Sequence, residues 1–267
     1  MAVVFQASLD TGWVQSEPRT QSPMPRPNRI VVLTGAGISA ESGVATFRGE
    51  DGLWEGHRIE EVATPVAWWR DPDTVWRFYS LRRKALLDVE PNPAHHALVR
   101  LEREGPEMLL ITQNVDDLHQ RAGSSSLLPM HGQLRMLRCE RSGRHQERMA
   151  EADLDPSTFV ECTCCSTPSR MRPDIVWFGE VPMGMDRIHA AIDALRMGDL
   201  CLVVGTSGHV HPAAGIAAAA RNVGARTVLV NLEAPVNLHD FDEVHLGPAG
   251  GTLPGLVEAW LEEWNDA

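Results

Sequence analysis

Small and polar residues follow directly after four short apolar runs of the sequence. Each run is typical of a buried parallel strand: 30–34, 108–112, 200–204 and 227–231. Because the carboxyl ends of parallel strands meet at one edge of a sheet, the residues there are candidates for a ligand site. Each end alone could be a solvated loop, whereas four together favour a site. The candidates are Gly35, Ala36, Gly37, Ala40, Gln113, Asn114, Val115, Asp116, Gly205, Thr206, Ser207, Asn231, Leu232 and Glu233.

The first of these turns, residues 35–40, has the form GxGxxA and precedes a predicted helix. Glycines allow a tight turn and close approach of the backbone to a pyrophosphate, and a helix N-terminus favours negative charge. The pattern indicates a dinucleotide, although glycine at such a turn can be purely structural. The acidic residue expected about 20 residues on, at the end of a second strand, is missing. The ribose must therefore be held elsewhere, or the chain is not a simple dehydrogenase.

Four of the five cysteines stand close together: Cys139, Cys162, Cys164 and Cys165. Cys162 and Cys165 have the CxxC spacing of a metal-binding pair, but three positions after Cys139 stands Ser142, a poor zinc ligand. We predict one structural zinc on Cys139, Cys162 and either Cys165 or Cys164. The fourth ligand would be Cys164, His145 or water. A set of inert thiols is the alternative.

Helical patterns lie between the apolar runs, at 93–104, 212–222 and 256–264. Strands that alternate with helices predict an α/β fold with a doubly wound, Rossmann-like parallel sheet. Two stretches break the alternation, and we interpret them as a smaller helical and zinc-ribbon-like lobe, 44–92 and 136–171. The larger lobe would then comprise 29–43, 93–135 and 172–267, preceded by a flexible tail over 1–28.

Charge and composition narrow the classes of partner. The net charge is −12, from 24 basic and 36 acidic residues, which repels nucleic acid and anionic lipid and attracts basic protein segments. No apolar run reaches the roughly 18 residues of a membrane span, and the N-terminus lacks the features of a secretory signal. Five cysteines, an odd number, do not suggest a disulfide scaffold, and Cys201 is assigned to the core. We expect a cytoplasmic protein with neither nucleic acid nor membrane as partner; its oligomeric state is open, a monomer included.

Six motifs of the sequence resemble those of the sirtuins, the NAD-dependent protein-lysine deacylases, and they occur in the same order as in that family. The resemblance covers about residues 29–260, and the segments RCERSG, ECTCC and RPDIVWFGEVPMGMD are similar to the bacterial branch related to class III desuccinylases and demalonylases. Ala45 stands where many relatives have proline, which could loosen the cofactor-binding loop but removes no functional group. The motifs are GAGISAESGVATFRG (35–49), TQNVDDLHQRAG (112–123), His131-Gly132, VWFGE (176–180), GTSGHVHPAA (205–214) and NLE (231–233).

The resemblance implies that acyl groups (acetyl, succinyl or malonyl) pass from protein lysines to NAD, giving nicotinamide and O-acyl-ADP-ribose. The amide oxygen of the acyl-lysine would attack the ribose carbon as nicotinamide leaves, and His131 would be the general base on a ribose hydroxyl. Asn114 and Asp116 would orient that ribose, with Gln113 beside them. Asn231 and Glu233 would hold the adenosine ribose. The other NAD-binding residues implied are Thr46, Phe47, Arg48, Trp54 and Ala249.

The resemblance also implies where the acyl-lysine substrate binds. The segment VWFGE would pair with the extended peptide as a strand, through Val176, Phe178, Gly179 and Glu180. Tyr79 and Arg82, three positions apart, share one face of a helix that Asp71 and Pro72 are expected to begin. In the class III branch such a pair binds the acyl carboxylate, which an arginine fork and a phenol match. An ordinary amphipathic surface, with Arg83 as an equally exposed neighbour, is the alternative.

Two other functions stay open from the sequence alone. One is transfer of ADP-ribose to a protein, which the mass of the products would distinguish from deacylation. The other is a non-catalytic NAD-sensing or protein-binding module. That module would need a lost base, whereas His131, Asn114 and Asp116 are all present.

Overall fold

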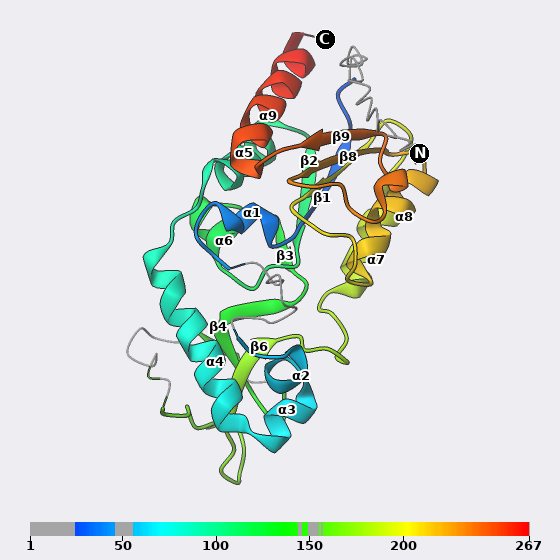
Figure 1. Ribbon diagram of the computed structural model, residues 1–267. Coiled ribbons are helices and arrows are strands. Elements are labelled where there is room, and N and C mark those ends of the chain that lie inside the picture. The colour runs from blue at the N-terminus through cyan, green and yellow to red at the C-terminus, as the bar shows by residue number, and fades with distance from the viewer. Residues whose placement is uncertain (1–24, 46–55, 144–145, 149–154, 156, 267) are drawn as a thin grey trace, which may run out of the picture.

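Six parallel strands form the larger sheet of the computed structural model (Figure 1), which describes residues 25–45, 56–143, 146–148, 155 and 157–266. The strand order is β3-β2-β1-β7-β8-β9. The chain therefore builds outward from β1 on one side and then returns to build outward from β7 on the other. The strands are β1 (Arg29–Thr34), β2 (Glu107–Thr112), β3 (Leu127–Pro129), β7 (Leu200–Val204), β8 (Arg226–Asn231) and β9 (Glu243–Leu246).

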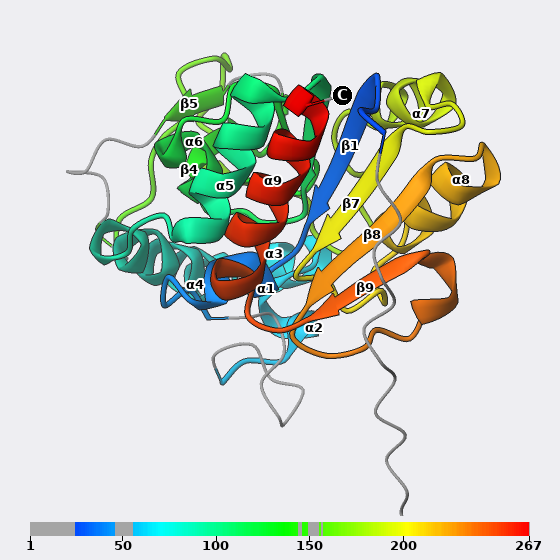
Figure 2. The ribbon, with the colours of Figure 1, turned by 90° about the horizontal axis from the view of Figure 1, so that it is seen from above.

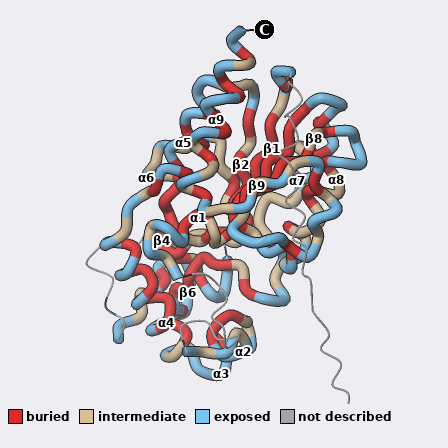
Figure 3. The backbone as a smooth tube through the Cα atoms, turned by 45° about the horizontal axis from the view of Figure 1, so that its top comes forward, coloured by how far each residue is buried: buried red, intermediate tan, exposed pale blue. Residues whose placement is uncertain are grey.

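Helices cover both faces of this sheet (Figure 2). Side chains of a strand alternate between the faces, so Ile30 and Val32 pack beneath α5 (Pro93–Glu104) and α9 (Ala249–Asp266). Val31 and Leu33 pack on the other face, beneath α7 (Met185–Ala194) and α8 (Ile216–Asn222). Burial on both sides explains why these strands are continuous apolar runs (Figure 3). The predicted doubly wound α/β fold is confirmed.

A smaller antiparallel sheet, of order β5-β4-β6, lies beyond the larger one (Figure 1). It packs with three helices around a core of its own, rich in tryptophan. The sequence-based boundaries left 132–135 and 172–175 with the larger lobe, whereas Gly132 pairs with Ile175 and Gln133 with Asp174 in this sheet. The elements are β4 (Gly132–Cys139), β5 (Gln146–Arg148), β6 (Met171–Ile175), α2 (Ile59–Val62), α3 (Pro65–Arg70) and α4 (Pro72–Ala85).

Local signals at helix ends agree with the structure in two places and differ in two. Asp71 caps α4 by accepting a hydrogen bond from Thr74 N at 3.1 Å, and α5 spans the predicted 93–104. The helix expected over 212–222 begins as a 3₁₀ turn and becomes α8 only at Ile216. Helix α9 begins at Ala249 rather than 256, because packing against α5 overrides the helix-opposing glycines and Pro254 of its first part.

The remaining elements are short. In the part of the chain that the structure describes, no helix is both long enough and apolar enough to cross a membrane. The short elements are α1 (Gly37–Ala40), α6 (Leu118–Ala122) and the 3₁₀ turns Leu86–Asp88, Ala213–Gly215 and Leu238–Asp240.

Candidate active site

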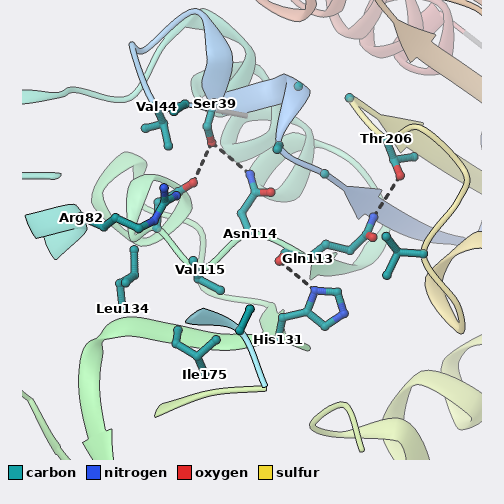
Figure 4. A pocket seen from close by; sticks show the side chains of 18 of the residues that line it. Ser39, Val44, Arg82, Gln113, Asn114, Val115, His131, Leu134, Ile175 and Thr206 are labelled. Carbon is teal, nitrogen blue, oxygen red and sulfur yellow. Dashed lines mark hydrogen bonds between the residues drawn. The ribbon is translucent and has the colours of Figure 1, made fainter. Parts of the chain in front are cut away.

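A cavity of about 700 Å³ opens at the carboxyl ends of β1, β2, β7 and β8 and extends to the smaller sheet (Figure 4). This volume suits a ligand of cofactor size. The predicted strand-end, base and substrate residues that line it come from both sheets and from α4: Gly35, Ala36, Gly37, Gln113, Asn114, Val115, Asp116, Gly205, Thr206, Ser207, Asn231, Leu232, Glu233, His131, Tyr79, Arg82, Val176, Phe178, Gly179 and Glu180.

Two predicted cofactor-binding residues do not line this cavity. Ala40 is exposed at the end of α1, and Ala249, only 5% exposed, packs into the core between the larger sheet and its helices. The predicted Thr46, Phe47, Arg48 and Trp54 lie outside the described residues.

The turns after β1 and β7 are in backbone contact. Gly37 N donates to Gly205 O at 2.8 Å, and Gly35 N donates to Val204 O at 2.9 Å. A Cβ on Gly37 would lie 2.7 Å from Gly205 Cα, and Gly205 itself has φ +65°, so both positions require glycine. These two N–H groups are used within the protein. Phosphate oxygens of a dinucleotide must therefore find other donors than the first and second glycines of the GxGxxA turn.

Ser39, which the sequence analysis missed, joins the two predicted ribose-orienting residues (Figure 4). Its hydroxyl donates to Asp116 Oδ2 at 2.9 Å and accepts from Asn114 Nδ2 at 3.0 Å. Ser39 is fully buried, and burial raises the pKa of Asp116 above its ordinary value although the bonds from Leu118 N and Ser39 lower it. The sequence signal that could have identified Ser39 is a hydroxyl within the GISA segment (37–40), which faces the end of the next strand.

Buried polar side chains of β1, β2 and α6 support the loop that contains Asn114. Thr34 Oγ1 donates to Thr112 Oγ1 at 2.8 Å, and Thr112 Oγ1 also accepts from Asn114 N at 3.1 Å. His119 Nε2 lies 3.0 Å from Thr34 Oγ1, and its ring meets that of His95 edge-on. Burial lowers the pKa of His119 to about 3 and that of His95 to about 4. Both rings are therefore neutral and add no charge beneath the site.

His131 presents one ring nitrogen as a base. Its Nδ1 lies 3.0 Å from Gln113 O; because a carbonyl only accepts, Nδ1 carries the proton and Nε2 of the neutral ring is unprotonated. Burial lowers the pKa of His131, an effect that the Gln113 bond partly offsets. The turn depends on Gly132, where φ is +84° and a Cβ would lie 1.9 Å from Asp174 O. Gln113 Nε2 in turn donates to Thr206 Oγ1 at 3.2 Å.

Tyr79 and Arg82 lie in the wall of this same cavity, on α4. Tyr79 is fully buried and Arg82 is 7% exposed. In Figure 4 the Arg82 side chain extends from α4 toward the strand ends of the larger sheet. Tyr79 Oη accepts a hydrogen bond from Trp177 Nε1 at 3.0 Å, and burial raises the pKa of Tyr79, so its hydroxyl stays protonated.

The expectation that Arg83 is exposed is wrong. Arg83 has no exposed surface: it donates to Ser80 Oγ at 2.7 Å and its guanidinium lies 4.7 Å from the Trp76 ring centre. Burial lowers the pKa of Arg83 to about 10, so it keeps its charge at neutral pH. Helix α4 is therefore enclosed on more than one side. The charge of Arg83 does not reveal this in the sequence, because a long side chain can bury its methylene groups while its charged group finds polar or aromatic partners.

The predicted strand-like edge VWFGE is a turn. Strand β6 ends at Ile175, and Glu180 N bonds back to Trp177 O at 2.9 Å. The N–H groups of Val176, Trp177 and Phe178 also bond within the protein. Among residues 176–180 the structure records no such bond for Gly179 N, and a Cβ at Gly179 would meet open space. The pairing of a substrate peptide with this segment stays a prediction, for which Gly179 N and the backbone carbonyls are the groups at hand.

Four cysteine sulfurs gather at the far end of the smaller sheet. All lie within 4.8 Å of one another, with Cys139 and Cys165 Sγ 3.5 Å apart and Cys162 and Cys164 Sγ 2.9 Å apart. In a tetrahedral site with Zn–S near 2.3 Å, sulfurs lie about 3.8 Å apart, so the set fits one structural zinc. Cys164 supplies the fourth thiol that Ser142 does not. His145, the other candidate, lies outside the described residues.

Comparisons with known proteins agree on one family. Residues 35–212 match the Sir2 family. An NAD-dependent protein deacylase of Salmonella typhimurium is 48% identical over 237 residues, 88% of this chain and 84% of that protein. A solved complex of a Sir2 homologue with NAD has a TM-score of 0.82 at 37% identity, covering 91% of this chain and 93% of the other. A Sir2 complex with a p53 peptide and NAD⁺ has a TM-score of 0.72 at 28% identity, covering 89% and 94%.

The zinc site yields a first prediction. Metal analysis should find about one zinc per chain, and Cys164→Ser should lower the affinity for zinc, because a serine hydroxyl is a poor zinc ligand. Cys201→Ala should leave the zinc content unchanged, because Cys201 is buried within β7 and burial raises the pKa of its thiol to about 12. Full zinc content and affinity in Cys164→Ser would show that another group completes the site.

Proposed function

This chain belongs to the Sir2 family and is an NAD-dependent protein deacylase, and we propose that it prefers protein lysines that carry acidic acyl groups such as succinyl or malonyl. The observation that carries the proposal is a buried positive charge in the wall of the reaction cavity. Arg82 lines the same cavity as His131 although it is only 7% exposed. A cavity that holds such a charge is a favourable environment for an anionic group and adds little to the binding of a neutral one.

The position of Arg82 relative to the other charges supports this preference. Arg82 is close enough to Asp116 to lower the pKa of that carboxyl, against the larger effect of burial, which raises it. Tyr79, one helical turn away on α4, contributes a hydroxyl to the same wall. An arginine fork and a phenol together match the two oxygens of a carboxylate. An acetyl group has no oxygen at that depth and would gain nothing from either residue.

The remaining residues suit the catalysis of acyl transfer. When bound, NAD supplies an electrophilic ribose carbon and ribose hydroxyls. We assign His131 Nε2 the role of accepting a proton from a ribose hydroxyl, since its Nδ1 proton is held by Gln113 O at 3.0 Å. Asn114 and Asp116, connected through Ser39, would orient that ribose. Asn231, Leu232 and Glu233 line the cavity at the end of β8 and would hold the adenosine end.

The zinc would act on structure and not on the reaction. Its four cysteines lie outside the lining of the cavity, and Cys139 is the last residue of β4. Free thiols persist in a reducing compartment, where disulfides are rare. All five cysteines are unpaired, and we propose the cytoplasm as the site of action.

The role of His131 can be tested by mutation and by pH. His131→Ala should lower kcat/KM on an acyl-lysine peptide by about 10²–10⁴-fold, the loss of a positioned base. The base must be neutral, so activity should fall as the pH falls through the pKa of His131. Because burial lowers that pKa, the acidic limb should lie below the ordinary value of about 6.5.

The matched control is His96→Ala, since His96 is exposed on α5. Its kcat/KM and pH profile should equal those of the wild type. A folded His131→Ala variant with wild-type turnover would remove His131 from the mechanism.

The preference for acidic acyl groups can be tested at Arg82. Arg82→Met keeps the length of the side chain and removes the charge. Hydrogen bonds to charged groups contribute about 1.5–3 kcal/mol each, so desuccinylation and demalonylation should fall roughly tenfold to hundredfold in kcat/KM. Deacetylation should change little. The readout is kcat/KM on peptides of one sequence with acetyl-, malonyl- or succinyl-lysine.

Arg77→Met, on the exposed face of α4, is the control and should alter neither activity. Arg83→Met is unsuitable as a control, because Arg83 is buried. An equal loss of deacetylation and desuccinylation in Arg82→Met would contradict the proposed preference.

A further inference from the structure

We propose that Trp177 is the positioning residue for acyl selectivity: its indole N–H orients the Tyr79 hydroxyl so that this hydroxyl donates toward an acyl carboxylate. The inference rests on the proposed preference for acidic acyl groups and assigns a role to a residue that the sequence analysis did not single out. Trp177 lies in the VWFGE turn, 98 positions from Tyr79 in the chain.

The direction of the Tyr79–Trp177 hydrogen bond is unambiguous. An indole nitrogen can only donate, so Tyr79 Oη is the acceptor at 3.0 Å. A phenol that accepts from the indole turns its own O–H away from it. Both side chains line the cavity, and they are 0% and 1% exposed. Removing the indole would remove the hydrogen bond that this hydroxyl accepts from Trp177.

Trp177 is itself held in place by Arg172 and by Glu180. The Arg172 guanidinium lies 3.4 Å from the centre of the indole ring. The same guanidinium donates hydrogen bonds to the two carboxylate oxygens of Glu180 at 2.8 and 2.9 Å. Glu180 Oε2 also accepts a hydrogen bond from Trp177 N at 2.9 Å. Arg138 adds a further bond to Glu180 at 3.1 Å. Ring and backbone of Trp177 are thus fixed by one cluster of charges.

This cluster gives Glu180 a positioning role in addition to the substrate contact predicted for it. Its two carboxylate oxygens are occupied by Arg172, Arg138 and Trp177 N. The two arginines face Glu180 and Asp174, and Arg138 Nε lies 3.7 Å from Asp174 Oδ1. Two positive and two negative groups leave the cluster nearly balanced. Its effect on an acyl carboxylate would therefore pass through the position of Trp177 and not through net charge.

The other buried tryptophans of the smaller core do not share this arrangement. Trp68 Nε1 donates to Glu140 at 3.0 Å. Trp76 Nε1 has no hydrogen-bond partner among the described residues. Neither side chain lines the cavity. Trp76→Phe is therefore a matched control for Trp177→Phe, because each removes an indole from the same core and only one removes a hydrogen bond.

The kinetic test compares Trp177→Phe, Tyr79→Phe, the double variant and Trp76→Phe in the full-length, zinc-loaded protein. Trp177→Phe should lower kcat/KM on succinyl- and malonyl-lysine peptides about three- to tenfold, the effect of one hydrogen bond between neutral groups. The ratio of its kcat/KM on succinyl-lysine to that on acetyl-lysine peptide should fall below the wild-type ratio. The double variant should be no worse than Tyr79→Phe, because the indole acts only through the hydroxyl. Trp76→Phe should leave the succinyl-to-acetyl ratio unchanged.

A second readout does not depend on activity. Tyr79 is the only tyrosine of the chain, so protein labelled with ¹³C at tyrosine Cζ shows a single resonance that reports its hydrogen bonding. Trp177→Phe should shift this resonance and Trp76→Phe should not. A succinyl-lysine peptide should shift it in the wild type, whereas an acetyl-lysine peptide of the same sequence should not.

Each outcome decides between the two proposals. If Trp177→Phe lowers deacetylation and desuccinylation equally, or if its effect multiplies with that of Tyr79→Phe, Trp177 has only a structural role and the inference is overturned. If Arg82→Met and Tyr79→Phe also leave the succinyl-to-acetyl ratio unchanged, the acidic-acyl preference itself fails. Should Trp177→Phe not fold, Glu180→Gln takes its place: a lower ratio supports the inference, and an unchanged ratio in the folded variant overturns it.

Discussion

The site depends on a backbone contact between two turns that no side chain could enter. Gly37 N bonds to Gly205 O, and a Cβ on Gly205 would lie 2.4 Å from Ile38 N. This contact stands where the strand order reverses, between β1 and β7, which is where open α/β sheets bind ligands. It sets the spacing of the strand ends, so that Ser39 reaches Asn114 and Asp116, and Gln113 reaches Thr206. Replacing either glycine would separate the ends that form the site.

Burial lowers the pKa of buried histidines and buried arginines alike, but with different consequences for their charge. It lowers the pKa of His95, His119 and His131, so these imidazoles are neutral near neutral pH. It also lowers the pKa of Arg83 and Arg172, but an arginine starts so high that it stays charged. The same low dielectric thus favours the neutral form of His131, which a general base requires, while the buried arginines keep their charge.

Local signals in the sequence were sufficient to predict the main strands of the larger sheet and the start of helix α4. Continuous apolar runs located β1, β2, β7 and β8 because strands buried on both faces have no alternation, and the Asp71-Pro72 pair located the start of α4. The four polar strand ends led to the cavity for the same reason, since topology alone brings them together. The boundaries of the smaller lobe could not be predicted from the sequence, because β4 and β6 pair across more than 30 residues of intervening chain. Amino-acid composition does not reveal such a pairing.

What the sequence could not supply were contacts between distant side chains. Arg83 looks like a surface residue until Trp76 and Leu134 are known to surround it. The VWFGE segment was expected to be strand-like, yet it turns back on itself, with Glu180 N bonded to Trp177 O and Trp177 N bonded to Glu180 Oε2. The fourth zinc ligand was undecided among Cys164, His145 and water until the thiols were placed within 4.8 Å of one another. Leu134 is 51 positions from Arg83 and Cys139 is 26 positions from Cys165, whereas Trp177 and Glu180 are only three apart; none of these contacts follows from a local sequence pattern.

Strand β4 connects the two chemical centres of the smaller lobe. His131 immediately precedes its first residue, Gly132, and its last residue is Cys139 of the cysteine cluster. Its partner β6 begins at Met171, opposite Cys139, and ends at Ile175, opposite Gly132, directly before the turn that holds Trp177. Between the ends the register shifts from Gln133 to Leu137, so the middle of the pair is irregular and cannot by itself keep the ends aligned. A metal at Cys139 would fix one end, while the Gly132–Asp174 contact fixes the other. His131, the proposed base, and Trp177 thus flank one end of the strand pair whose other end carries the cysteine cluster, so a metal there would act on the cavity through these strands and not by lining it.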